Sequence, residues 1–264
     1  MTKKVYAITG VATGIGAEAA KILTTRGHEV VGFDIAEPDT SHVEHFIQLD
    51  LTKPEEIDHA IAKVSGSLDG LLNNAGLPPR EGLEEKILQV NFLSQRIFTE
   101  ALLPRLNKGS SIVNMASRAG HRWQASLEQV KRFSKISSFD EVPDFLAQEG
   151  IDPLRAYDLS KEAMILWTLA ETEPMIARGL RINSISPGAI ATRILDDFAA
   201  AFGDRMSKNV ARAGRAGTPK EVAELAVFLL SPESSWINGT DIAIDGGMGG
   251  FNMCDQLGLE TFQV

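Results

Sequence analysis

The residues of this chain that could do acid–base chemistry lie in one short segment, Tyr157-Asp158-Leu159-Ser160-Lys161. If the segment is helical, Tyr157 and Lys161 are spaced i and i+4 and share one face. A tyrosine hydroxyl has a pKa near ~10, and a neighbouring ammonium favours its ionised form. Such a pair could exchange a proton with a bound substrate. Taken alone, the pattern is more typical of a surface tyrosine packed on a lysine stem.

Two further polar residues favour the catalytic interpretation. Ser117 follows an expected strand at 111–115, and Asn91 lies inside an expected long helix over about 83–106. A serine hydroxyl can donate to a substrate oxygen and stabilise negative charge that develops there. For Asn91, the alternative is a buried asparagine that caps a kinked helix.

A glycine-rich turn near the N-terminus predicts a site for a phosphate-bearing ligand. The turn, 9–16, reads Thr-Gly-Val-Ala-Thr-Gly-Ile-Gly and joins an expected buried strand to an expected helix. Gly10 permits the tight turn, Gly14 allows a pyrophosphate to approach, and Gly16 lets the helix pack on the sheet. Turns collect glycine for steric reasons, but this position between strand and helix is that of dinucleotide-binding proteins.

Asp34 indicates which dinucleotide is preferred. It ends the expected strand 29–34, 18 residues after Gly16. A carboxylate there accepts hydrogen bonds from the adenosine ribose hydroxyls and repels a 2′-phosphate. No arginine or lysine stands in the glycine turn or directly after Asp34 to receive such a phosphate. We therefore expect NAD rather than NADP; the alternative is a solvated turn aspartate.

The elements that must position these residues alternate along the chain. We expect seven strands and place six of them, at 5–9, 29–34, 69–72, 111–115, 180–185 and 241–244. Helical patterns separate them, at 15–26, 54–64, 83–106, from about 152, and 219–230. This order predicts an α/β fold, a doubly wound parallel sheet of the Rossmann type, in a single dinucleotide-binding domain over 1–264.

Three stretches depart from the alternation. Residues 121–151 read as a helical insertion, with two short helices around Ser137-Ser138, and such insertions usually serve function or an interface. Residues 191–215, rich in alanine, arginine and glycine, resemble a mobile flap. The tail after Gly247, which includes Phe262, is apolar enough that we expect it to cover a pocket or a neighbouring surface.

Composition excludes several classes of protein. The 26 Lys+Arg and 35 Asp+Glu leave a net charge of −9, which argues against nucleic-acid or anionic-membrane partners. No apolar stretch approaches the ~20 residues of a membrane span. The lone Cys254 excludes an internal disulfide, and His42 with His45 lacks a third ligand, so we expect a solvated loop there and no metal. These features predict a cytoplasmic protein.

Two further groups of residues have ordinary structural interpretations. Trp123, Trp167 and Trp236 could line a pocket for a planar substrate, but simple burial is the default expectation. A solvated helix face is expected for the basic residues near the insertion, and the alternative is that they face an anionic group of the substrate; these residues are Arg118, Arg122, Lys131, Arg132 and Lys135.

Taken together, the motifs resemble those of the short-chain dehydrogenase/reductase family. They occur in the family's order from residue 5 to about 247. The matching pieces are 9–16, Asp50-Leu51, Asn73-Asn74-Ala75-Gly76, Asn91 in Val-Asn-Phe, 114–117, 157–161, 181–188 with Ile190 and Thr192, and Asp245-Gly246-Gly247.

The resemblance implies roles for individual residues. Asn91, Ser117, Tyr157 and Lys161 match the catalytic tetrad, in which Lys161 and the oxidised nicotinamide lower the pKa of Tyr157 and Asn91 holds a relay water. The implied NAD-binding residues are Gly10, Thr13, Gly14, Ile15 and Gly16 at the pyrophosphate, Asp34 and Ile35 at the ribose, Asp50 and Leu51 at the adenine, Asn74, Ala75 and Gly76 beside the adenosine, Tyr157 and Lys161, and Pro187, Gly188, Ile190 and Thr192 near the nicotinamide.

The resemblance also narrows the expected activity. Ser117 and Tyr157 are 40 residues apart. This spacing, together with the sequence at 161–163, Trp167 and 236–239, resembles that of bacterial coniferyl-alcohol dehydrogenases. It also resembles, more distantly, bacterial 3α-hydroxysteroid dehydrogenase/carbonyl reductases. We expect an NAD-dependent oxidoreductase acting on an apolar alcohol or carbonyl compound, first an aromatic allylic alcohol. The alternatives are a 3-hydroxysteroid dehydrogenase/carbonyl reductase and a non-catalytic NAD-binding sensor. A homodimer or homotetramer is expected.

Overall fold

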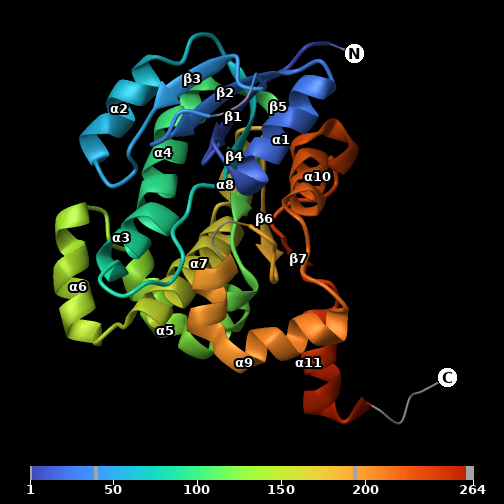
Figure 1. The fold of residues 1–264 in the computed structure, drawn as a ribbon. Coiled ribbons are helices and arrows are strands. Elements are labelled where there is room, and N and C mark those ends of the chain that lie inside the picture. Colours follow the sequence, from blue (N-terminus) through green and yellow to red (C-terminus); the bar gives the residue numbers. More distant parts are fainter. Residues whose placement is uncertain (1, 39–40, 193–194, 260–264) are drawn as a thin grey trace.

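A seven-stranded, wholly parallel sheet forms the centre of the molecule (Figure 1). The computed structural model describes residues 2–38, 41–192 and 195–259. The strand order is β3-β2-β1-β4-β5-β6-β7. The first three strands are added toward one edge of the sheet and the last four toward the other, so the strand order reverses between β1 and β4. The strands are β1 (Val5–Thr9), β2 (Glu29–Asp34), β3 (His45–Gln48), β4 (Leu68–Asn73), β5 (Leu106–Met115), β6 (Arg181–Pro187) and β7 (Asp241–Ile244). The doubly wound α/β fold expected from the sequence is confirmed.

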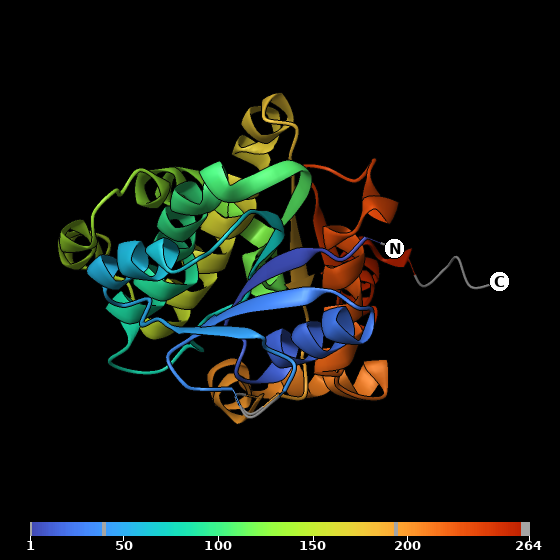
Figure 2. The ribbon, with the colours of Figure 1, turned by 90° about the horizontal axis from the view of Figure 1, so that it is seen from above.

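Helices cover both faces of the sheet (Figure 2). On one face α1 and α10 enclose an apolar core with β1 and β4, and on the other face α2, α4 and α7 enclose a second core. Because both faces are covered, the central strands are buried along most of their length, and so are polar residues within them such as Ser111 and Asn114 of β5. The α-helices are α1 (Gly14–Thr25), α2 (Pro54–Ala62), α3 (Glu84–Leu88), α4 (Ser94–Leu102), α5 (Leu127–Ser134), α6 (Val142–Glu149), α7 (Pro153–Ala170), α8 (Thr172–Ala177), α9 (Leu195–Ala213), α10 (Pro219–Leu230) and α11 (Met248–Leu257).

The long helical stretch expected over about 83–106 is present from Glu84 to Arg105, but it is not α-helical throughout. A π-helical turn, Gln89–Leu93, separates α3 from α4, and the chain has already entered β5 at Leu106. Pro104 lies in the short 3₁₀ turn that ends α4, where it cannot donate a helical backbone N–H. Inserted π turns widen a helix locally and are common at functional sites.

The seventh strand is His45–Gln48, which the sequence analysis did not place. It is a four-residue edge strand beside β2, and only Ile47 is buried in it. His45 therefore lies in an edge strand and not in the loop that was expected, although its side chain is exposed as expected. His42 lies just before the strand, with Nδ1 3.1 Å from the hydroxyl of Thr24.

The insertion contains the two short helices that its apolar spacing predicts. α5 and α6 are joined by a 3₁₀ turn, Phe139–Glu141, which begins with a capping box between Ser138 and Glu141. A longer 3₁₀ stretch, Arg118–Ser126, precedes them and was not predicted. Arg96 of α4 donates to the carbonyls of Ser134 and Ile136, so the insertion is fastened to the body of the fold.

The C-terminal third departs from expectation in part. Most of the expected flap forms α9, which is kinked at Gly203 (φ +53°); residues 193–194 lie outside the described part. The apolar tail begins as α11, which lies beside α9 at the bottom of Figure 1, whereas 260–264, including Phe262, are outside the described residues. Trp167 is buried and Trp123 is half-buried, but Trp236 is 98% exposed, so burial is the wrong expectation for it. Within the described residues, no helix is long and apolar enough to cross a membrane.

Candidate active site

One large cavity lies along the carboxyl ends of the strands. It has a volume of about 980 Å³, which is enough for a dinucleotide and a small second molecule. Segments that follow β1, β2, β4, β5 and β6 line it. Ligands of such sheets typically bind at the carboxyl ends of the strands, where the strand order reverses. Every residue that the sequence analysis assigned to a site lines this cavity except Gly16 and Asn91.

The glycine turn forms the wall of the cavity above β1. Gly10 has φ +68°, and a Cβ atom there would lie 2.8 Å from the Cα of Ala75. A Cβ on Gly16 would lie 2.1 Å from the carbonyl oxygen of Gly10, so Gly16 supports the turn from beneath. Thr13 precedes α1 and makes no side-chain capping hydrogen bond within the described residues. The first N–H groups of α1 are therefore available to an anion in the cavity.

Buried polar contacts fix the two strand ends on either side of this turn. The Asn74 side chain donates to the carbonyls of Thr9 (3.1 Å) and Gly10 (3.0 Å). In return, the Thr9 hydroxyl accepts from the backbone N–H groups of Asn74 and Ala75 and donates to Gln95 of α4. The sequence analysis missed Thr9 and Gln95, because only the fold brings β1 beside α4.

The carboxylate of Asp34 is held in a fixed orientation at the edge of the cavity. Oδ2 accepts from the backbone N–H of Ala12 at 2.9 Å, and Oδ1 accepts from that of Ala36 at 3.1 Å. Ile35 follows it in the cavity wall and is 60% exposed. The residues at this end could hold the adenosine ribose of a dinucleotide.

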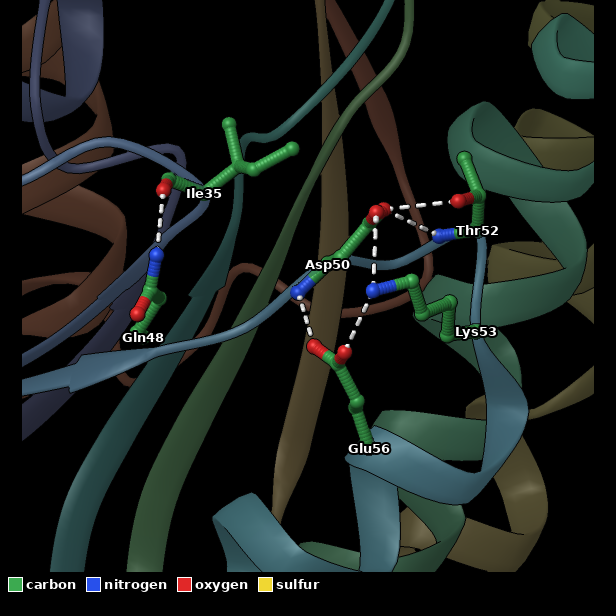
Figure 3. A network of polar contacts seen from close by, with 6 residues as sticks. All are labelled: Ile35, Gln48, Asp50, Thr52, Lys53 and Glu56. Atoms are coloured by element: carbon green, nitrogen blue, oxygen red, sulfur yellow. Dashed lines mark hydrogen bonds and ion pairs between the residues drawn. The ribbon is translucent and has the colours of Figure 1, made fainter.

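Asp50 lies at the far end of the same wall in a polar network (Figure 3). Its Oδ1 accepts from the backbone N–H (2.9 Å) and hydroxyl (2.7 Å) of Thr52, and its own N–H donates to Glu56. Burial alone raises the pKa of the Asp50 carboxyl, but the hydrogen bonds from Thr52 and the charge of Lys53 outweigh it and hold the pKa below its usual range. Asp50 is therefore an ionised acceptor.

At the other end of the cavity the candidate catalytic residues come together. Tyr157 and Lys161 lie on one face of α7, and the Lys161 Nζ is 5.7 Å from the centre of the Tyr157 ring. Nζ also donates to the carbonyl of Met115, at 2.8 Å. The hydroxyl of Ser117, directly after β5, hydrogen-bonds to that of Tyr157 and accepts from the N–H of Ala119.

The electrostatics of this group differ from the sequence expectation. Burial raises the pKa of the Tyr157 hydroxyl above its ordinary value, against a smaller lowering by the hydrogen bond from Ser117. Burial lowers the pKa of the Lys161 ammonium to about 8. The expectation that Lys161 lowers the pKa of Tyr157 is thus not met here, because the desolvation of both groups dominates.

Asn91 lies behind the cavity wall rather than in it. It belongs to the π-helical turn, where its side chain accepts from the N–H of Leu77 (2.7 Å) and donates to the carbonyl of Leu77 (3.0 Å). A Cβ on Gly76 would lie 3.3 Å from Asn91 Oδ1 and 3.6 Å from Lys161 Nζ. Both side chains therefore face the same small space, which glycine leaves open.

Near the nicotinamide position expected from the sequence, the wall is formed by the segment after β6. Pro187, Gly188, Ile190 and Thr192 all line the cavity. A Cβ on Gly188 would lie 2.8 Å from the Cβ of Asp245, so this close approach requires glycine.

The remaining wall comes from the insertion and the C-terminal helices. Arg118, just before the insertion, pairs with Asp245 at 3.0 Å, and Asp245 accepts the N–H of Gly249 at the start of α11. Helices α9 and α11 also contribute to the wall; their lining residues are Met206 and Asn209 of α9 and Met248, Gly249 and Asn252 of α11. None of the three tryptophans is among the described lining residues. Of the basic residues expected on a solvated face, Arg118 and Arg122 instead line the cavity, because 118–126 folds back along α7.

The sequence matches two family models that together cover nearly the whole chain. Residues 4–128 match the model described as short chain dehydrogenase, and residues 144–249 match that described as enoyl-(acyl carrier protein) reductase.

Characterised relatives and a solved structure agree with these matches. The chain is 37% identical over 250 residues to the coniferyl-alcohol dehydrogenase of Pseudomonas sp. (strain HR199 / DSM 7063), covering 94% of this chain and 97% of that protein. It is 30% identical to the 3-alpha-hydroxysteroid dehydrogenase/carbonyl reductase of Comamonas testosteroni, over 92% of this chain and 96% of that protein. The crystal structure of the 3-alpha-hydroxysteroid dehydrogenase from Pseudomonas sp. B-0831 complexed with NADH is similar, with a TM-score of 0.79, 29% identity, and coverage of 98% and 100%.

Proposed function

The chain belongs to the short-chain dehydrogenase/reductase family of oxidoreductases, and on that premise we propose that it is an NAD-dependent dehydrogenase of apolar alcohols. The observation that carries the proposal is the cavity along the carboxyl ends of the strands, which has the Asp34 carboxylate at one end and Ser117 with Tyr157 at the other.

Three features of the cofactor end support NAD. The glycines of the turn leave space that a Cβ would fill, the first N–H groups of α1 can receive the pyrophosphate, and Asp34 can accept from both ribose hydroxyls. A 2′-phosphate would meet the Asp34 carboxylate, which the N–H groups of Ala12 and Ala36 hold in place. We infer discrimination against NADP from this repulsion.

The proposed chemistry assigns one task to each residue of the catalytic group. When bound, the oxidised nicotinamide accepts the hydride, and its positive charge favours the ionised form of the Tyr157 hydroxyl. Tyr157 takes the proton of the substrate hydroxyl, and Ser117, already hydrogen-bonded to Tyr157, orients the substrate oxygen. Lys161, with its pKa lowered to about 8, can pass a proton on near neutral pH. Asn91 faces the same space beside Gly76 as Lys161, which suits a relay water.

For the substrate we propose an aromatic allylic alcohol of the coniferyl type. The support is the relative named coniferyl-alcohol dehydrogenase, which is 37% identical along almost the full length of both proteins. A 3-hydroxysteroid or its ketone is the second candidate, favoured by the relative named hydroxysteroid dehydrogenase/carbonyl reductase and by the NADH-bound structure.

The test is to follow NADH absorbance with purified protein, offering coniferyl alcohol and a 3α-hydroxysteroid with NAD and with NADP. We expect turnover with NAD and coniferyl alcohol, and at least tenfold less with NADP. Turnover of the steroid alone would select the second candidate. Tight binding of NAD without turnover of either alcohol would favour the non-catalytic sensor and contradict the proposal.

A further inference from the structure

A buried carboxylate on α7 lies in the cavity wall but has no part in the proposed chemistry. Glu162 follows Lys161 directly, is only 3% exposed and lines the cavity. Carboxylates are seldom buried without partners that neutralise them. Its contacts therefore show what else it can bind.

The two oxygens of this carboxylate have different surroundings. Oε2 accepts from the Arg155 guanidinium at 2.6 Å and from the Ser126 hydroxyl at 2.8 Å. Oε1 receives no hydrogen bond from any residue in the described part of the chain. The charge is thus neutralised through one oxygen, while the other retains its capacity to accept.

A relay of side chains holds the carboxylate in this orientation. Arg155 also donates to Gln129 of α5 (2.8 Å), and Gln129 donates to Glu149 of α6 (3.0 Å). Gly120 lies so close to α7 that a Cβ on it would be 2.7 Å from the backbone of Lys161. The insertion therefore fixes Glu162 before any ligand arrives.

An acceptor that the cavity reaches and that has spare capacity favours a ligand that brings a donor. Because Arg155 neutralises Glu162, a neutral donor such as a hydroxyl suits Oε1 better than a second anion or an apolar group. Glu162 is five residues beyond Tyr157, about 7.5 Å along the helix axis. The hydroxyl that it binds is therefore a different one from the hydroxyl that Tyr157 deprotonates.

We propose that Glu162 determines substrate specificity by accepting a hydrogen bond from a second hydroxyl, remote from the reacting carbon. The enzyme then selects aromatic alcohols that carry a phenolic hydroxyl over those that lack one. This inference rests on the proposed alcohol dehydrogenase function and names the substrate class within it.

The test compares 4-hydroxycinnamyl alcohol with cinnamyl alcohol, which differ only in the phenolic hydroxyl. We expect the kcat/KM of the wild type to be about 10- to 100-fold higher for 4-hydroxycinnamyl alcohol. Cinnamyl alcohol lacks the phenolic hydroxyl and would leave the Glu162 carboxylate oxygen unpaired in the complex. Glu162→Gln, which keeps the shape and removes the charge, should reduce that ratio at least about fivefold. The matched control is Glu128→Gln, an exposed carboxylate of α5 that pairs with Lys131 outside the relay, and this variant should keep the ratio within about threefold.

The possible outcomes separate the two proposals. A purely structural role for Glu162 would slow both alcohols alike and leave their ratio unchanged in Glu162→Gln, which would overturn the inference. Equal use of both alcohols by the wild type would overturn it as well, while the dehydrogenase function would stand. No turnover of either alcohol would overturn both. If Glu162→Gln does not fold, two measurements on the wild type still test the inference: the ratio of kcat/KM for the two alcohols, and their dissociation constants from the NADH-loaded protein. Equal values for the two alcohols would contradict the proposed role of Glu162.

Discussion

The two ends of the cavity are built in different ways. At the cofactor end, backbone groups and small residues form the wall, and local hydrogen bonds such as that from Ala12 to Asp34 fix the few side chains. At the substrate end, charged pairs contribute to the wall: Arg118 pairs with Asp245 from a distant segment, and Arg155 pairs with Glu162 of the same helix, α7. The catalytic group of Ser117, Tyr157 and Lys161 belongs to the substrate end.

The wall at the cofactor end follows from the packing of the fold, whereas the wall at the substrate end depends on segments particular to this chain. The cofactor end depends on the close approach of β1, β4 and α1, which any member of the fold must reproduce. The substrate end depends on the insertion and on α11, so changes there can alter specificity without disturbing the cofactor. The following predictions test this division, from the largest expected effect to the smallest.

Tyr157→Phe should remove the acid–base group of the substrate end. We expect kcat to fall by about 10²- to 10⁴-fold, while the dissociation constant of NAD stays within about twofold. Steady-state kinetics and fluorescence titration with NADH measure the two effects separately. A kcat close to that of the wild type would remove Tyr157 from the mechanism.

Gly16→Ala should damage the cofactor end alone. The new Cβ would lie 2.1 Å from the carbonyl oxygen of Gly10, so the turn must shift, and NAD binding should weaken by about 10- to 100-fold. Gly27→Ala is the control: its φ is also positive (+83°), but no atom lies within 4 Å of the new Cβ. That variant should lose about 1 kcal/mol of stability and bind NAD normally. Equal NAD binding by both variants would contradict the assigned turn.

Asp34→Ala should change which dinucleotide is used without changing which alcohol is used. Loss of the carboxylate removes the ribose acceptor and the repulsion of a 2′-phosphate, so the NAD/NADP ratio of kcat/KM should fall by about tenfold or more. The measurement is kcat/KM for each cofactor at saturating alcohol. An unchanged ratio would place cofactor discrimination elsewhere.

Arg118→Met should give the smallest effect and act at the substrate end. Without its partner, Asp245 still accepts from Gly247 and Gly249, so α11 should loosen rather than unfold. We expect the KM of the alcohol to rise by about three- to tenfold, with NAD binding unchanged. Arg26→Met, which breaks an exposed pair with Glu224 between α1 and α10, is the control and should leave both constants unchanged. A larger effect on NAD than on alcohol would contradict the division between the two ends.

The same division explains how much could be predicted from the sequence. The strand-turn-helix at 5–25 and Asp34 form one continuous βαβ unit, so local spacing was enough to predict their places. The insertion helices were also predicted, because their apolar residues repeat with helical spacing.

Features that depend on distant contacts were missed. The π turn at Asn91 is fixed by Leu77 in another segment, and no local pattern marks it. Strand β3 has a single buried residue, too weak a pattern to identify. Glu162 resembles any helix-surface glutamate until the fold places Ser126 and Arg155 beside it.

The most direct test is a crystal structure with NADH and coniferyl alcohol, which cannot react because both are reduced. We expect Asp34 to hydrogen-bond to the adenosine ribose, and the hydroxyls of Ser117 and Tyr157 to contact the alcohol oxygen beside the nicotinamide. A structure in which the alcohol lies away from Ser117 and Tyr157, or in which the nicotinamide lies at the Asp34 end, would contradict the account.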